Sequence, residues 1–127
     1  MTDTYLYLIH EPDWDSDAYA DGAGGDLQQE FPQYAAFSEA VTRLGARIVG
    51  GEALHSARYG GRVRPGEGSD DERVGGAVYT DGPFPDTAEV VSGFYLVETD
   101  DEAVARRIAA LVPSGGYVEW RKVFPMS

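Results

Sequence analysis

The chain has 127 residues, enough for one domain that buries about two thirds of its unfolded surface. Hydrophobic residues make up 43% of it and charged residues 25%, which is typical of a globular protein. The formal net charge of −12 argues against nucleic-acid binding, because that binding neutralises phosphates with lysine and arginine. It argues equally against an anionic membrane surface.

The chain contains no cysteine, which excludes disulfides, thiolate metal sites and a cysteine nucleophile. Residues 1–4 form no basic segment leading into an apolar one, so no signal peptide is expected. No apolar run approaches the length of about 20 residues that spans a bilayer. We therefore expect a cytoplasmic protein. Arginine supplies every basic residue except Lys122, a bias associated with GC-rich bacterial genomes.

The first part of the chain predicts a strand and a helix. Residues 5–9 form an unbroken apolar run, and because both faces of this strand are apolar, we expect it near the centre of a sheet. An acidic, glycine-rich loop at residues 11–26 leads into an amphipathic helix that ends before Gly45. The helix begins either at Asp26, acting as a cap, or at Pro32, which suits the first helical position.

The middle of the chain predicts further strands. Residues 47–54 read as a second strand, and a hairpin follows in which residues 57–64 and 73–79 are joined by a polar loop at 65–72. Alternation along the hairpin places three arginines on one face: Arg58, Arg62 and Arg64. The next strand is expected at residues 93–98.

A second helix and a last strand complete the predicted elements. Thr99 and Glu102 have capping-box spacing at the start of this helix, and Pro113 stops it. Its expected buried stripe consists of Val104, Ile108 and Leu111. The last strand, residues 117–124, carries apolar residues on both faces.

This order of elements predicts an α+β fold, a ferredoxin-like sandwich with an added β-hairpin. The helices of such a sandwich cover only one face of the sheet, yet the first and last strands are apolar on both faces. A second copy of the chain is the simplest cover for the remaining face. We therefore expect a homodimer that packs sheet against sheet.

A distinctive turn, residues 80–87, separates the hairpin from the strand that follows it. Its prolines and the Asp81–Gly82 pair cannot continue a sheet ladder, because proline lacks the donor and Asp-Gly favours a turn. Phe84 is an apolar ring inside this turn and must point into a core or a pocket.

Several segments carry a resemblance to a known family: Gly50–Leu54, Tyr79–Phe84, Gly93–Glu98 and Gly116–Glu119. In this order they resemble the YCII-related (YciI-like) family, in particular its DGPF branch. The resemblance covers nearly the whole chain. It implies a dimeric α+β barrel built from ferredoxin-like protomers, which agrees with the fold expected from the pattern of elements.

The resemblance implies less about function. Most of the family is uncharacterised, and DGPF proteins are often encoded near sigma factors of the extracytoplasmic-function type. Relatives are proposed to use a His–Asp pair, and one branch dehydrochlorinates an aromatic substrate. Other dimeric α+β barrels include cofactor-free monooxygenases and lactone isomerases. The DGPF pattern matches Asp81 but no histidine of this chain.

The candidate catalytic residues are His10, His55 and Asp81. Each histidine ends a predicted strand and either acts as a general acid or base or lies at the surface without a role. Asp81 either accepts hydrogen bonds from its own turn or orients a histidine. We expect a pocket between the first helix, the sheet and this turn, lined by Trp14, Glu52, Phe84 and Tyr95. Glu52 either faces that pocket or forms a salt bridge with an arginine of the hairpin.

The acidic loop invites a comparison with calcium-binding loops. Asp13, Asp15, Asp17 and Asp21 have EF-hand spacing. The match fails at Ala18, where glycine is needed, and at Gly24, where a bidentate glutamate belongs. We therefore expect a solvated loop that acts as a lid, no metal and no cofactor.

Two classes of function remain open. The first is a cofactor-independent enzyme, a lyase, isomerase or monooxygenase, that acts on a small aromatic or lactone-like molecule. The second is a non-catalytic dimer that binds a ligand or a partner, with a link to sigma-factor regulation. A histidine within reach of Asp81 in a closed cavity favours the enzyme, whereas exposed histidines far from Asp81 favour the binding module.

Overall fold

The computed structural model describes residues 2–19, 32–82 and 89–126. In chain order the elements are β1 (Asp3–Glu11), the 3-10 helix η1 (Ser16–Tyr19), α2 (Pro32–Arg43), β2 (Arg47–Ala53), the 3-10 helix η2 (Ala57–Tyr59), β3 (Gly61–Arg64), α3 (Asp70–Gly75), β4 (Val78–Asp81), β5 (Val90–Thr99), α4 (Glu102–Leu111) and β6 (Tyr117–Lys122).

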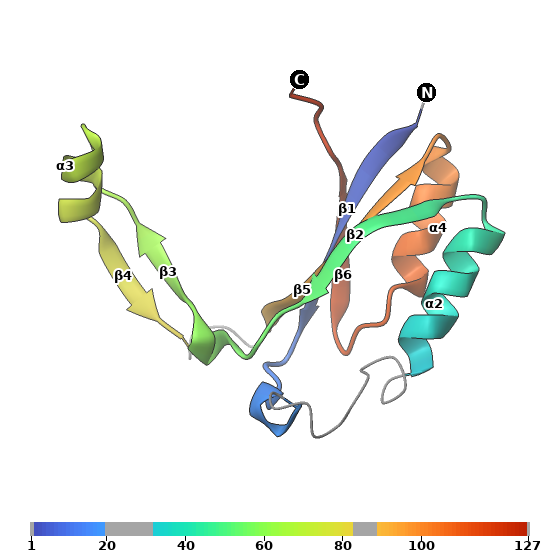
Figure 1. Ribbon diagram of the computed structural model, residues 1–127, viewed down its shortest axis with the longest axis horizontal. Helices are drawn as coiled ribbons and strands as arrows, with labels where there is room; N and C mark the ends of the chain where they lie inside the picture. The colour runs from blue at the N-terminus through green and yellow to red at the C-terminus, as the bar shows by residue number, and fades with distance from the viewer. Residues whose placement is uncertain (1, 20–31, 83–88, 127) are drawn as a thin grey trace.

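The main sheet has four strands in the order β2-β5-β1-β6, and each neighbouring pair is antiparallel. Helices α2 and α4 lie side by side on one face of this sheet (Figure 1). This order, with a helix after the first and third of its strands in sequence, is that of a ferredoxin-like fold. The expected α+β class is confirmed, and β1 lies in the interior of the sheet.

The hydrophobic core lies between the sheet and its helices. Alternate residues of β1, namely Tyr5, Tyr7 and Ile9, face this core and are at most 5% exposed. They pack with Phe37 and Val41 of α2 and with buried residues of β5 and α4. No helix in the described residues is long and apolar enough to cross a membrane.

Of the two predicted starts for the first helix, the structure has α2 beginning at Pro32, where the missing N–H of proline costs no hydrogen bond. Asp26 lies outside the described residues. The end agrees with the prediction, because Gly45 adopts a φ of 79° that favours glycine and turns the chain out of the helix.

The cap and the buried stripe of α4 differ from the prediction. Asp101, rather than Thr99, caps the helix, since its carboxylate accepts a hydrogen bond of 2.9 Å from the Ala103 N–H. The buried residues of the helix are Ala105 and Ile108, whereas Leu111 is 43% exposed. Asp101 directly precedes the first helical residue, so its side chain reaches the unpaired N–H groups of the first turn, whereas Thr99 lies two residues further away.

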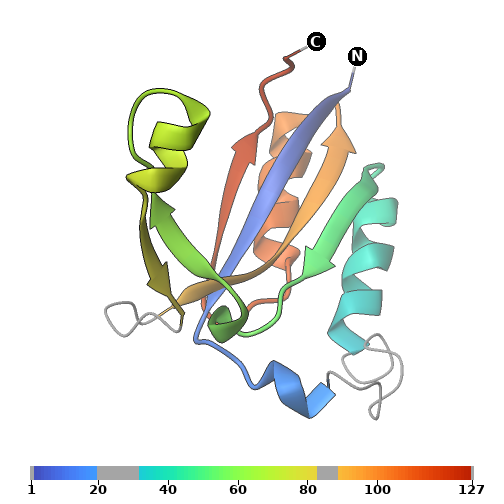
Figure 2. The ribbon, with the colours of Figure 1, turned by 60° about the vertical axis from the view of Figure 1, so that its left-hand side comes forward.

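The predicted hairpin exists but contains a helix in place of a simple loop. Its strands are β3 and β4, and α3 lies between them, so the predicted strand at residues 73–79 is wrong in its first half. The cause is local, because Ser69 and Glu72 form a capping box that starts a helix. Figures 1 and 2 show this segment, residues 61–81, standing away from the main sheet, and we call it the arm.

The face of the sheet opposite the helices, here called the open face, is apolar at its centre. Register places four half-buried residues of β1 and β5 on it: Leu6, Leu8, Phe94 and Leu96. The last strand was predicted to be apolar on both faces, but β6 does not continue this apolar surface. Glu119 and Arg121 of β6 lie opposite Leu8 and Leu6, and β6 ends at Lys122, before the apolar residues of the C-terminus.

Candidate functional site

A cavity of about 640 Å³ lies where the arm joins the main sheet. Both predicted catalytic histidines line it, and we call it the histidine cavity. Its other lining residues include Leu54, Tyr59, Arg62, Glu89, Val91 and Tyr117. The ends of β1, β2 and β6 therefore bring together residues that are far apart in the sequence.

His10 lies near the end of β1, where the register with β5 shifts between Ile9 and His10. Its Nε2 lies 3.2 Å from Oε1 of Glu119, and its ring stacks on Tyr117 with centroids 4.5 Å apart and planes 8° apart. The other oxygen of Glu119 accepts a hydrogen bond of 2.6 Å from Arg121. The imidazole is thus held by a carboxylate on one edge and by an aromatic ring on one face.

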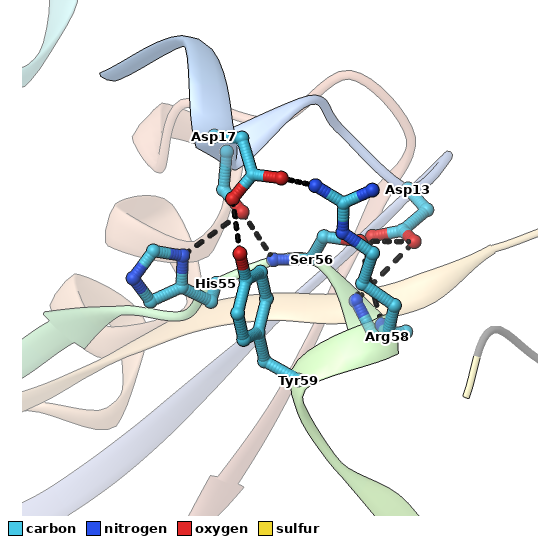
Figure 3. Close-up of polar contacts among 8 residues, drawn as sticks. Asp13, Asp17, His55, Ser56, Arg58 and Tyr59 are labelled. Atoms are coloured by element: carbon cyan, nitrogen blue, oxygen red, sulfur yellow. Dashed lines mark hydrogen bonds and ion pairs between the residues drawn. The ribbon is translucent and has the colours of Figure 1, made fainter. Parts of the chain in front are cut away.

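His55 is held by a different group. Its Nδ1 lies 3.0 Å from Oγ of the buried Ser16, and this oxygen accepts a hydrogen bond of 2.7 Å from the Ser56 N–H (Figure 3). The Ser16 hydroxyl thus joins the His55 ring to the backbone of the following residue. The ring also packs against Tyr59, with centroids 4.7 Å apart.

The described part of the acidic loop is bound to η2 and the residue before it, contrary to the expected solvated lid. Asp13 accepts hydrogen bonds of 2.9 Å from the Ser56 hydroxyl and 3.0 Å from the Ala57 N–H. Asp17 accepts from Tyr59 and forms an ion pair with Arg58 (Figure 3). These carboxylates are used as anchors, and no cluster of three metal-ligating side chains occurs within the described ranges.

Asp81 ends β4 and is exposed. In the part of the chain that the structure describes, no hydrogen bond or ion pair joins it to His10 or His55. Its ladder partner Gly61 does line the histidine cavity. A Cβ on the next residue, Gly82, would lie 1.8 Å from the Ala57 carbonyl oxygen, so the Asp-Gly turn needs glycine for close contact with η2.

A second cavity, of about 450 Å³, lies at the start of α2 and is here called the aromatic cavity. Three of the predicted pocket residues, Trp14, Glu52 and Tyr95, line it. Phe84, the fourth, lies outside the described residues. Glu52 forms no ion pair with a hairpin arginine among the described residues, contrary to that alternative.

Sequence reasoning missed four polar residues of the aromatic cavity: Glu11, Gln33, Tyr34 and Ser92. Tyr34 lies in the first turn of α2, and alternation along β1 was the available signal for Glu11. Burial raises the pKa of Tyr34, and the nearby Glu11 carboxylate raises it further. Burial and the neighbouring Tyr34 likewise raise the pKa of Tyr95, so both phenols stay protonated at neutral pH.

Neighbouring residues of β1 line different cavities. Ile9 and Glu11 line the aromatic cavity, whereas His10 between them lines the histidine cavity. Successive side chains of a strand point to opposite faces, which explains the separation. Trp14 is fixed beside this strand end, because its indole N–H donates a 2.9 Å hydrogen bond to the Leu54 carbonyl.

The ferredoxin-like sheet, covered by helices on one face, defines a small α+β domain with cavities at one end. The chain matches the YCII-related domain over residues 6–127 and belongs to this family. No curated protein matches the chain significantly. Membership in the family assigns no reaction, so the function has to be argued from the cavities.

Proposed function

We propose that the chain is a cofactor-independent enzyme of the isomerase or lyase type. It transfers a proton to and from a small ring-shaped molecule in the histidine cavity, and His10 carries that proton. The pairing of His10 with Glu119 is the observation that supports this proposal most. A carboxylate on one ring nitrogen fixes the tautomer and stabilises the imidazolium, as in catalytic His–acid pairs.

The direction of proton transfer follows from this pairing. When Nε2–H donates to Glu119, the lone pair of Nδ1 is available, and the His10 ring makes no other hydrogen bond among the described residues. Nδ1 takes a proton from a carbon of the substrate, Glu119 stabilises the resulting imidazolium, and the same proton returns to another atom. Glu119 is a positioning residue, and a general base of this kind contributes about 10²- to 10⁴-fold to the rate.

The walls of the cavity favour a neutral aromatic or lactone-like ring. Leu54, Val91 and Tyr117 provide apolar and aromatic surface, and few charged groups interrupt it. Tyr59 adds a second ring beside His55. The acid that orients His10 is Glu119 in this proposal, so Asp81 has the structural role of shaping the turn at the base of the arm.

One observation favours a non-catalytic binding module instead. Neither histidine contacts Asp81 among the described residues, and both His55 and Asp81 are exposed. In that case the histidine cavity binds a ligand without changing it chemically, and the protein has a regulatory role.

Deuterium exchange separates these alternatives without knowledge of the true substrate. Lactones and ring ketones are incubated with the protein in D₂O, and proton NMR follows the loss of signal from their acidic C–H groups. We expect exchange with the wild type for at least one compound and a loss of about 100-fold or more in His10→Ala. Glu119→Gln should lower the rate and change its pH profile, whereas the exposed Glu39→Gln should not.

Binding seen by saturation-transfer NMR without any exchange would contradict the enzyme and support the binding module. Exchange that survives in His10→Ala would show that another group carries the proton. Folding of every variant is checked by circular dichroism.

We also propose that the chain forms a homodimer through the open face and the arm. The open face is apolar at its centre, and the charged groups at its rim are already paired within the chain, Arg47 with Glu98 and Arg121 with Glu119, so two copies can meet there without burying an unpaired charge.

The arm supports the same proposal. Its apolar side chains are exposed, Val63 by 53%, Val78 by 62% and Tyr79 by 67%. A two-stranded hairpin is only marginally stable by itself, so it needs a surface to pack on. The arm and the open face border the same V-shaped opening (Figures 1 and 2), which a second copy can enter.

A further inference from the structure

We infer that the aromatic cavity is a second binding site, separate from the histidine cavity, and that it takes a small organic cation with an ammonium group and an apolar body. The two cavities lie on opposite sides of the end of β1. A ligand can therefore bind in one cavity while the other is empty.

The charges that line the aromatic cavity are all of one sign. Glu11 and Glu52 supply carboxylates, and none of the described lining residues is lysine, arginine or histidine. Oε2 of Glu11 accepts a 2.7 Å hydrogen bond from the Gly115 N–H, which holds this carboxylate in place. An anionic ligand would meet repulsion here without any compensating cation, whereas an ammonium group would meet attraction.

Aromatic rings form much of the remaining wall, beside the uncharged polar residues Gln33 and Ser92. Trp14, Tyr34 and Tyr95 come from three different segments of the chain, and all three line this cavity. The face of an aromatic ring carries negative charge density and attracts a cation placed over it. Rings combined with carboxylates are the chemistry that recognises ammonium groups in proteins, and the volume of about 450 Å³ suits a small molecule.

The position of Tyr95 depends on a glycine. A Cβ on Gly51 would lie 2.8 Å from the Tyr95 ring, so a side chain there would displace the ring. Phe37 packs against the same ring on its helix side, with centroids 4.8 Å apart. The aromatic wall is thus built into the fold.

Three probes that share a benzene ring test the charge preference: benzylammonium, benzyl alcohol and benzoate. Calorimetric titration of the full chain at low salt should show benzylammonium binding at least about tenfold more tightly than benzyl alcohol, and benzoate more weakly than either. Glu52→Gln and Glu11→Gln should each weaken benzylammonium by about tenfold and leave benzyl alcohol unchanged.

Three controls separate the site from general attraction to an acidic protein. Glu39→Gln removes an exposed carboxylate of α2 outside the cavity and should leave benzylammonium binding unchanged. His10→Ala should also leave it unchanged. In ¹⁵N NMR the indole signal of Trp14 should move with benzylammonium, while that of Trp120, on β6 and outside this cavity, should not.

Equal affinity for the three probes, or tighter binding of benzoate, would overturn the inference. So would the absence of benzylammonium binding at millimolar concentration. A Glu11→Gln/Glu52→Gln double variant that keeps the affinity for benzylammonium would overturn it as well.

Discussion

At the scale of single residues, Tyr7 shows how the core tolerates a polar atom. Its side chain is 0% exposed, and its hydroxyl donates a 2.7 Å hydrogen bond to the Ala105 carbonyl of α4. Burial raises the pKa of Tyr7 to about 12. The hydrogen bond ties the central strand to the helix, and the apolar surroundings keep the phenol protonated.

Tyr7→Phe should lower the free energy of unfolding by about 1 kcal/mol, because it removes a buried hydrogen bond while keeping the ring. Urea unfolding followed by circular dichroism measures this change. Tyr117→Phe, on a 53% exposed tyrosine of β6, is the matched control and should change stability by less than about 0.5 kcal/mol. Equal stability of the two variants would contradict a structural role for the Tyr7 hydroxyl.

The same residue predicts a pH dependence. The pKa of Tyr7 is about 12 in the folded chain and near its model-compound value of 10.0 when unfolded. Between pH 10 and pH 12 the unfolded state releases the proton while the folded state keeps it, so stability falls as pH rises through this window. Wild type should therefore lose more unfolding free energy than Tyr7→Phe across it. Parallel pH curves for the two proteins would refute this linkage.

At the scale of elements, helix starts are decided by which side chain reaches the unpaired N–H groups. In α3 the Ser69–Glu72 capping box starts a helix of six residues within a loop, and it lowers the pKa of Glu72 through hydrogen bonds from Ser69. In α4 the capping residue is Asp101, two residues after Thr99, which was predicted to cap the helix. Thr99 instead accepts a hydrogen bond from the Asp101 N–H at 3.2 Å and supports the cap.

Asp101→Ala should cost about 1 kcal/mol of stability, because the Ala103 N–H loses its acceptor at the start of α4. The neighbouring Asp100→Ala removes the same charge without a cap and serves as the control. Thermal unfolding at equal concentration compares the two variants. If Asp100→Ala were as destabilising as Asp101→Ala, net charge rather than capping would explain the loss.

At the scale of the whole molecule, the helices cover one face of the sheet and the arm extends from one end of β2 (Figure 2). The Gly82 N–H donates a 3.1 Å hydrogen bond to the Gly60 carbonyl, so the arm leaves and returns at one point. Its contacts with the rest of its own chain are therefore concentrated at its base, as expected for a segment that packs on a second copy.

Sedimentation equilibrium at micromolar concentration should give the mass of a dimer. Leu96→Glu places a charge in the centre of the open face and should shift the equilibrium to monomer, because the carboxylate would be buried without a partner. Leu111→Glu, on the exposed side of α4, should remain dimeric. A monomeric wild type, or a dimeric Leu96→Glu that is folded by circular dichroism, would contradict the proposed interface.

Local patterns were enough to predict the α+β class, the central strand β1 and the end of α2 at Gly45. Each depends on interactions between residues near one another in the chain, namely alternation of apolar side chains and the φ of a glycine. Trp14, Glu52 and Tyr95 were predicted as pocket residues and line one cavity. The helix inside the arm was missed, although its capping box is a local signal.

The sequence by itself determined a ferredoxin-like α+β domain, because periodicity and caps act over a few residues. Only the tertiary structure decided which acid meets His10. Glu119 is 109 residues away, and the contact depends on the register between β1 and β6. A shift of one residue in that register would turn Glu119 to the other face of the sheet. The separation of His10 from Ile9 and Glu11 has a local origin instead, because the pleat of β1 sends neighbouring side chains to opposite faces.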